Sequence, residues 1–220
     1  MKKLLILLFS CFTAYTLAAQ PASYWQQQTD YRIRVQLNDS TRVLDGNLQL
    51  TYQNHSPDTL TFIWFHLWPN AYKNDRTAFS DQMLENGSTS FYFSSDDKKG
   101  YINRLDFKVN STTAVTADHP QHQDIIKLIL PQPLAPGNSV HIETPFHVKL
   151  PYNFSRGGYT SKTSFQLTQW FPKPAVYDKY GWHEMPYLDQ GEFFSEFGKF
   201  KVHITVPKGY IVAATGSLTA

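Results

Sequence analysis

Histidines near carboxylates are the residues of this sequence that could hold a metal ion or move a proton, and three groups of them stand out. The first, His183-Glu184, begins like the zinc-binding pattern H-E-x-x-H, but Tyr187 stands where the second histidine belongs. Pro186 also interrupts the helix that would bring two such histidines onto one face. This group therefore does not predict a zinc site.

The second group is a short polar stretch in which His119 and His122 lie between Asp118 and Asp124. Short histidine-rich tracts are indications from composition alone and do not fix a ligand geometry. The stretch has no helical spacing and falls between two predicted strands. We therefore interpret it as a solvated loop and not as a metal cluster.

The third group is His141, Glu143 and His147, in a stretch with strand-like alternation. All three numbers are odd, so the side chains would share one face of a strand and could ligate an ion. The polar face of a half-buried strand explains the same pattern, and we favour that interpretation.

Other chemistries have less support. The sequence has no G-x-S-x-G, P-loop or G-x-G-x-x-G motif. Its one cysteine, Cys11, lies in the N-terminal segment, so the mature protein should have no disulfide, catalytic cysteine or thiolate metal site. With 20 Lys and Arg against 18 Asp and Glu, the net charge of +2 provides no basic field for nucleic acid. We therefore expect no catalytic residue and no nucleic-acid partner.

The N-terminal segment has the pattern of a secretory signal peptide. Two lysines precede a short apolar run, and small residues end at Ala19. We expect residues 1–19 to be removed and the protein to be exported, to the periplasm or the extracellular space. A lipoprotein anchored through Cys11 is the less favoured alternative, because Phe9 is too bulky for a lipoprotein box. The apolar run is shorter than the roughly 20 residues of a membrane span, so no transmembrane segment is expected.

Beyond this segment the chain alternates with the period of a β-strand. From Tyr31 to Leu37 the odd-numbered residues are apolar and the even-numbered ones polar, which predicts a half-buried antiparallel strand. Residues 69–100 break the alternation and predict a long loop with a short helix near Thr77 to Leu84. Short strands separated by turns indicate an all-β antiparallel sandwich in one domain. The predicted strands are Tyr31–Leu37, Val43–Tyr52, Thr59–Trp68, Tyr101–Val109, Ile125–Leu130, Ser139–Val148, Phe165–Trp170, Lys199–Val206 and Tyr210–Ala214.

The stretch from Tyr159 to Gly216 carries the most distinctive motifs. Its strongest elements are Leu167-Thr-Gln-Trp-Phe-Pro172 and Gly209-Tyr-Ile-Val-Ala-Ala-Thr-Gly216. Together with the earlier stretch Leu60–Pro69 (LTFIWFHLWP), this series resembles the N-terminal domain of the aminopeptidase N family of zinc metallopeptidases, in its secreted bacterial branch. The resemblance covers nearly all of residues 24–220.

The resemblance implies a saddle-like β-domain over residues 20–220 that caps one side of an active site. In this family the zinc ligands and the general base lie in the following domain, on H-E-x-x-H and a later glutamate, and no such motif occurs before Ala220. The chain alone is therefore expected to be inactive and to hold no cofactor, with zinc in a missing catalytic domain. That domain and a peptide substrate are the implied partners, and the β-domain is expected to be truncated at its C-terminal edge.

Two candidate substrate-binding residues follow from the resemblance, Gln169 and Phe171. The family's Thr-Gln loop approaches the free amino terminus of the substrate, and Gln169 matches its glutamine. Two residues later many members have a Glu or Gln that binds the substrate amine, whereas this chain has Phe171. A ring face attracts a cation by about 0.5–2 kcal/mol but cannot accept a hydrogen bond in that way. The alternative is an ordinary strand end that packs its aromatic side chains.

Other functional classes stay open at this point. A free-standing β-sandwich could bind carbohydrate or protein through Trp64, Trp68, Trp170 and Trp182. That reading predicts an exposed aromatic cluster, whereas a structural role predicts buried tryptophans. The third possibility is an exported domain with a purely structural role.

Overall fold

The computed structural model describes residues 24–219 of the chain. The expected signal segment, residues 1–19, and Cys11 lie outside this range. No helix in the described part is long and apolar enough to cross a lipid bilayer. As predicted, the described chain is an all-β sandwich with one short α-helix.

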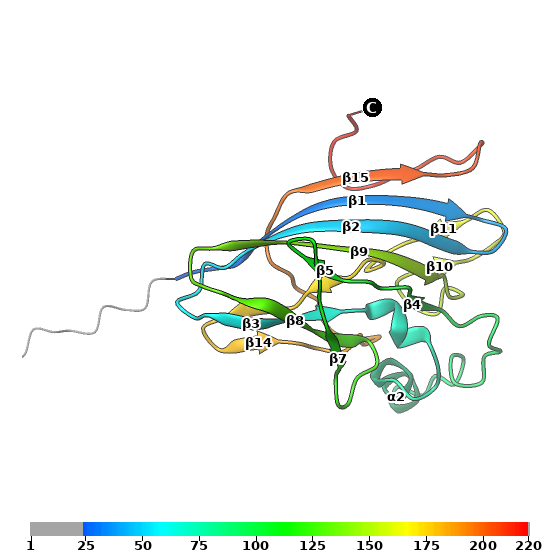
Figure 1. Cartoon of the computed structure of the whole chain (residues 1–220). Coiled ribbons are helices and arrows are strands. Elements are labelled where there is room, and N and C mark those ends of the chain that lie inside the picture. Colours follow the sequence, from blue (N-terminus) through cyan, green and yellow to red (C-terminus); the bar gives the residue numbers. More distant parts are fainter. Residues whose placement is uncertain (1–23, 220) are drawn as a thin grey trace, which may run out of the picture.

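A seven-stranded sheet forms the larger layer. Its strands are β1 (Gln28–Asn38), β2 (Val43–Gln53), β4 (Tyr101–Asn103), β5 (Lys108–Val109), β6 (Thr112–Thr113), β9 (Ser139–Lys149) and β15 (Phe200–Thr205). They lie in the order β15-β1-β2-β9-β5-β6, and β4 also pairs with β9 (Figure 1). The pairs are antiparallel except β1 with β15, which is parallel from Tyr31↔Phe200 to Gln36↔Thr205. This parallel edge pair departs from the antiparallel pattern that the sequence predicted.

A four-stranded sheet forms the second layer. It has the order β12-β3-β8-β7, and two small hairpins, β10–β11 and β13–β14, complete the strands. The bounds are β3 (Leu60–His66), β7 (Thr116–Asp118), β8 (Ile125–Leu134), β10 (Gly158–Tyr159), β11 (Phe165–Gln166), β12 (Lys173–Pro174), β13 (Val176–Asp178) and β14 (Gly181–His183).

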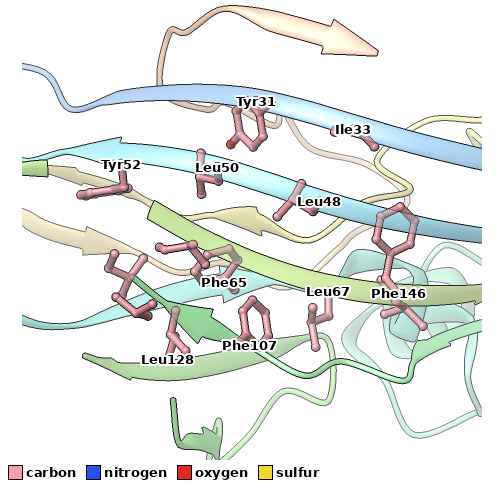
Figure 2. Close-up of a cluster of buried hydrophobic side chains, with 14 of the residues drawn as sticks. Tyr31, Ile33, Leu48, Leu50, Tyr52, Phe65, Leu67, Phe107, Leu128 and Phe146 are labelled. Carbon is pink, nitrogen blue, oxygen red and sulfur yellow. The ribbon is translucent and has the colours of Figure 1, made fainter. Parts of the chain in front are cut away.

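The main core lies between these two sheets. The alternation predicted for β1 is confirmed, because Tyr31, Ile33, Val35 and Leu37 are all buried. Figure 2 shows that side chains of β1 and β2 share this core with Phe65, which is fully buried on β3. The continuous apolar run of β3 is buried from Ile63 to the end of the strand, which fits a strand covered on both faces.

A second cluster packs where β3 ends. The 3-10 helix η2 (Trp68–Tyr72) follows β3, and α2 (Ala78–Glu85) follows η2. The predicted short helix is confirmed, and the Thr77 hydroxyl caps it by accepting from the Ser80 N–H at 3.3 Å. The buried residues of this cluster are Trp68, Ala71, Tyr72, Phe79, Met83, Phe91 and Tyr187.

Three predicted strands differ from the structure. The first, Tyr101–Val109, divides into β4 and β5, because the backbone turns at Arg104, where φ is 57°. Phe165–Trp170 is a strand only over Phe165–Gln166, because the backbone turns at Gln169, where φ is 53°. Tyr210–Ala214 has no strand, and β15 has no neighbour on its outer side within residues 24–219. A β-strand forms only when its backbone hydrogen-bonds to a neighbouring strand. The alternation of residues 210–214 was therefore not enough to make them a strand beside β15.

The strand β8 runs further than predicted, through Pro131 and Pro133 to Leu134. Its pairing with β3 jumps from Phe62↔Ile129 to Leu60↔Leu134, so the prolines lie within an irregularity of the ladder. Proline has no N–H to donate and is tolerated where the ladder is interrupted. This explains why Pro131 and Pro133 do not end the strand.

The edge strand β15 leaves apolar side chains in solvent. Phe200, Val202 and Ile204 pair with Tyr31, Ile33 and Val35, yet they are 52%, 41% and 38% exposed. The backbone edge on the other side of β15 is also free within the described residues. Exposed apolar edge strands promote association between chains.

We therefore expect this chain to aggregate through β15, and a charge on its apolar face should oppose that. Val202→Lys should lower light scattering at high protein concentration without lowering the free energy of unfolding by more than about 0.5 kcal/mol. Val115→Lys is the matched control, since Val115 is 71% exposed and lies outside β15. Equal scattering by the two variants, or a monomeric wild type with sharp reversible unfolding, would contradict the expectation.

A second prediction concerns the close packing of β2 on β9. Gly46 pairs with Phe146, and a Cβ added to Gly46 would meet the Phe146 ring. Gly46→Ala should therefore lower the free energy of unfolding by about 1–3 kcal/mol, because the ring must leave its buried site. Denaturant titration of this variant, of Phe146→Leu and of the double variant measures the coupling. Strictly additive losses would show that the ring does not require a glycine beneath it.

Candidate functional site

The loop between β11 and β12 is the part of the predicted site that the structure fixes most firmly. Gln169 has a left-handed backbone, φ 53°, which a non-glycine residue adopts at a cost of about 1–3 kcal/mol. The next strand, β12, pairs with the end of β3 through Lys173↔His66 and Pro174↔Phe65. The loop is thus attached directly to the core, which holds its strained turn in place.

Lys173 is a buried cation that holds the Gln169 side chain. It is 7% exposed, and its Nζ donates to Gln169 Oε1 at 2.6 Å. The same Nζ lies 4.2 Å from the centroid of the Trp68 ring, which gives a cation–π contact. Burial lowers the pKa of Lys173 to about 8, so the amine still carries its proton at neutral pH.

His66 lies on the other strand of this pair and stacks on Trp68, with ring centroids 4.4 Å apart. Its Nε2 accepts from the Met185 N–H at 3.2 Å, and the Trp68 Nε1 donates to the Met185 carbonyl at 3.1 Å. Burial lowers the pKa of His66 to about 3, so the ring is neutral with its hydrogen on Nδ1. Because Nε2 is occupied and Nδ1 is protonated and buried, this histidine does not act as a metal ligand or as a base.

A small cavity of about 30 Å³ opens beside Gln169. This volume holds about two water-sized atoms. Both buried tyrosines of the second cluster, Tyr72 and Tyr187, lie in its wall together with Gln169. The other lining residues are Trp68, Pro69, Val148, Leu150, Pro151, Gly157, Gly158, Gln166, Leu167, Thr168 and Trp170.

Phe171 lies apart from this cavity. Its ring meets Tyr31 edge-on at a centroid distance of 5.6 Å and Phe200 at 6.2 Å. The structure therefore places Gln169 at the cavity wall and Phe171 in aromatic packing against β1 and β15. The two predicted substrate-binding residues are not brought together on one surface.

The histidine groups considered in the sequence are dispersed. His183 contacts Asp178 within the β13–β14 hairpin, with Nε2 and Oδ1 2.8 Å apart. His119 and His122 stack on each other at 5.0 Å, and Asp124 is buried away from them, accepting from the Tyr187 N–H at 2.6 Å. Burial raises the pKa of Asp124 to about 6.

The third group lies on the outer face of β9. His141 is 3.1 Å from the Thr51 hydroxyl, and His147 is 2.7 Å from Asp45. Across residues 24–219, no three His, Cys, Asp or Glu side chains are grouped to hold a metal ion.

The tryptophans do not form an exposed cluster. Trp64 and Trp68 are 7% and 1% exposed. Trp170 and Trp182 are half-buried and pack on the core, Trp170 near Phe146 and Trp182 against Tyr177. This arrangement removes the surface on which the carbohydrate- or protein-binding alternative relied.

Sequence reasoning missed the residues that shape the loop. Lys173 stands between Pro172 and Pro174 in an otherwise apolar stretch, and a lysine in that setting is the one available signal. Tyr72 and Tyr187 are separated by more than 100 positions, so only the tertiary structure unites them. In the sequence, Tyr187 is distinctive only because it stands where H-E-x-x-H has its second histidine.

Comparison with known proteins finds many similar solved structures. No family model and no curated protein matches the chain. The M1 zinc metallopeptidase from Deinococcus radiodurans is similar over 89% of this chain, with 15% sequence identity and a TM-score of 0.47. A mutant two-domain M1 zinc metallopeptidase bound to L-arginine is similar over 91%, with 14% identity and a TM-score of 0.47.

Both structures carry the name of the peptidase family that the sequence resembles. This chain spans only 36% and 38% of the lengths of those two structures. Identities and TM-scores this low do not by themselves assign the chain to that family.

The buried ammonium of Lys173 leads to a pH-dependent prediction. The unfolded chain keeps the proton up to the ordinary pKa of 10.5, whereas the folded chain releases it near 8. Between these values the unfolded state binds more protons, so the free energy of unfolding rises with pH. The stability of the wild type relative to Lys173→Met should therefore increase by about 3 kcal/mol from pH 8 to 10.5.

Denaturant titrations of the wild type and of Lys173→Met across this pH range measure that difference in stability. Tyrosine ionisation affects both proteins equally and therefore cancels in the comparison. Gln169→Met is the control, since it removes the partner of Lys173 and keeps the amine. A stability difference that is constant with pH would show that the Lys173 amine is hydrated in the folded chain.

Proposed function

We propose that this chain is the N-terminal β-domain of an exported zinc-dependent aminopeptidase-like metallopeptidase, and that it caps one side of the substrate cleft. The parent protein would hydrolyse amino-terminal residues from peptides. The chain itself supplies no catalytic residue in this proposal, and the zinc and the general base belong to a downstream domain.

The observation that carries the proposal is the strained, braced turn at Gln169. Backbone strain persists where the surrounding structure over-determines it, and such outliers gather at ligand-binding sites. Here the strain falls on the glutamine of the Thr-Gln motif, and Lys173 and the β12–β3 pairing hold it. An ordinary strand end would have continued β11 without this turn.

The residues described do not fit a zinc site, as the scattered histidines show. No step of zinc chemistry is therefore derived for this chain. Its contribution would be positional, because a rigid β-sandwich that presents one loop to a cleft fixes the substrate relative to a metal held elsewhere. The attachment of the loop to β3 gives the rigidity that this role needs.

Two experiments test this proposal. The first is to sequence the coding DNA beyond the codon for Ala220. An H-E-x-x-H motif with a later glutamate would support a parent zinc peptidase, whereas an immediate stop codon with no such motif would contradict it.

The second experiment uses the extended product. Gln169→Ala should lower kcat/KM for an unblocked tripeptide by about tenfold, because one hydrogen bond to a polar substrate group is lost. Gln132→Ala is the matched control, since Gln132 is exposed on β8 away from the loop. Zinc content should be unchanged in both variants. Gln169→Ala should also lower the free energy of unfolding, because the buried Lys173 ammonium loses its hydrogen-bond partner, so the kinetics are measured well below its unfolding transition. An undiminished kcat/KM in Gln169→Ala would remove this loop from substrate binding.

A further inference from the structure

The outer face of the seven-stranded sheet carries a block of four basic side chains where β15 pairs with β1 (Figure 1). The register sets Arg32 beside Lys201. One row further along the strands it sets Arg34 beside His203. All four side chains are exposed, whereas Ile33 between the two arginines is buried on the core side. Neighbouring strands lie about 4.8 Å apart and alternate residues about 7 Å apart, so each basic group is next to another.

No carboxylate neutralises this block within residues 24–219. None of the four side chains takes part in an ion pair there. Three carboxylates border the block, and each has another neighbour: Asp30 accepts from the Lys199 N–H at 3.0 Å, Asp45 is 2.7 Å from His147, and Glu143 pairs in register with Lys108. Like charges directly opposite each other on neighbouring strands are destabilising, so the fold carries this block at a cost in stability.

Two amide side chains extend the block onto β2. Gln49 pairs with Arg32, and both are exposed. Asn47 pairs with Arg34 in the same way. Amides both donate and accept hydrogen bonds, whereas guanidinium and ammonium groups only donate. The two rows contain no apolar side chain, and we call their six residues the basic face: Lys201, Arg32, Gln49, His203, Arg34 and Asn47.

We infer that the basic face binds an acidic polysaccharide through its carboxylate groups. A guanidinium group binds a carboxylate with two parallel hydrogen bonds, and the two arginines supply two such groups on one strand. The amides of Asn47 and Gln49 match sugar hydroxyls, which also donate and accept hydrogen bonds. Bound carboxylates would offset the repulsion between the paired basic side chains.

Other anionic partners fit the basic face less well. Protein interfaces depend on buried aromatic anchors, single-stranded nucleic acid stacks on aromatic rings, and peripheral membrane binding buries apolar side chains. The two rows of the basic face contain none of these side chains. Three strands side by side are also too wide for the major groove of duplex DNA, which admits a helix or a two-stranded ribbon.

This inference goes beyond the proposed function and does not rest on it. The basic face lies on the outer side of the seven-stranded sheet. The cavity beside Gln169 lies on the opposite side, where the buried Val148 of β9 lines it. Binding at the basic face therefore needs no metal and no peptidase activity.

The test is binding of the chain to immobilised polysaccharides, at protein concentrations where light scattering shows a monomer. Polygalacturonate, which has one carboxylate per sugar, should bind with saturation, and added salt should weaken the binding because it screens exposed charges. Neutral dextran should not bind. Duplex DNA and vesicles that contain an anionic phospholipid should bind more weakly than polygalacturonate. Failure of polygalacturonate to bind, binding of dextran, or tighter binding of DNA or vesicles would overturn the inference.

Two double variants then locate the contacts. Arg32→Gln with Arg34→Gln should weaken polygalacturonate binding by about tenfold, because two exposed ionic contacts are lost. The same change should not lower the denaturant midpoint, since it removes opposed like charges. Lys162→Gln with Lys179→Gln is the matched control, because it removes the same charge from two exposed lysines outside the seven-stranded sheet. Unchanged binding in the arginine variant, or an equal loss in the lysine variant, would overturn the inference.

Discussion

Burial of apolar side chains between the seven-stranded and four-stranded sheets is the interaction on which the other features depend. Neither sheet can hide its apolar face alone, and each large side chain that is fully buried contributes about 1.5–3 kcal/mol. Phe65 lies at the centre of this contact, fully buried on a strand covered on both faces. Because β3 is fixed so firmly, whatever pairs with its end is fixed as well.

That dependence explains how a short irregular loop keeps an unfavourable backbone. The next regular structure after Gln169 is the two-residue strand β12, and its partner is the end of β3. The buried ammonium of Lys173 would be costly by itself, and its contacts with Gln169 and Trp68 offset part of that cost. The core thus holds the Lys173 ammonium and the Gln169 side chain in place, although burial among apolar side chains disfavours a charge.

The sequence predicted those parts of the fold that local periodicity decides. Alternation identified β1, β2 and β9, and the break in alternation after residue 69 indicated the short helix α2, because both signals lie within a few residues of chain. Local alternation could not predict the parallel pairing of β15 with β1, because the two strands lie about 170 positions apart in the sequence. The strand predicted at Tyr210–Ala214 is absent for a related reason. Alternation does not show whether another strand is available to pair with.

Of the candidate site, the sequence predicted only the residues that lie within the family-like motif. Gln169 was identified from a motif, and the structure adds the strained backbone and the lysine that holds its oxygen. The packing of Tyr72 against Tyr187 left no trace in the sequence, since it joins residues more than 100 positions apart. Phe171 matched a position by spacing, yet its ring packs on β1 and β15.

These facts bear on what kind of ligand the loop can recognise. A site for an ammonium group needs acceptors, and the two positions that would supply them here are an oxygen already bound to Lys173 and a phenylalanine ring. The Nε2 amide group of Gln169, by contrast, has no hydrogen-bond partner within residues 24–219. The polarity of the contacts that this loop makes is set by Lys173, a residue outside the Thr-Gln motif. The groups that Gln169 can offer at this surface therefore follow from the cation buried behind it.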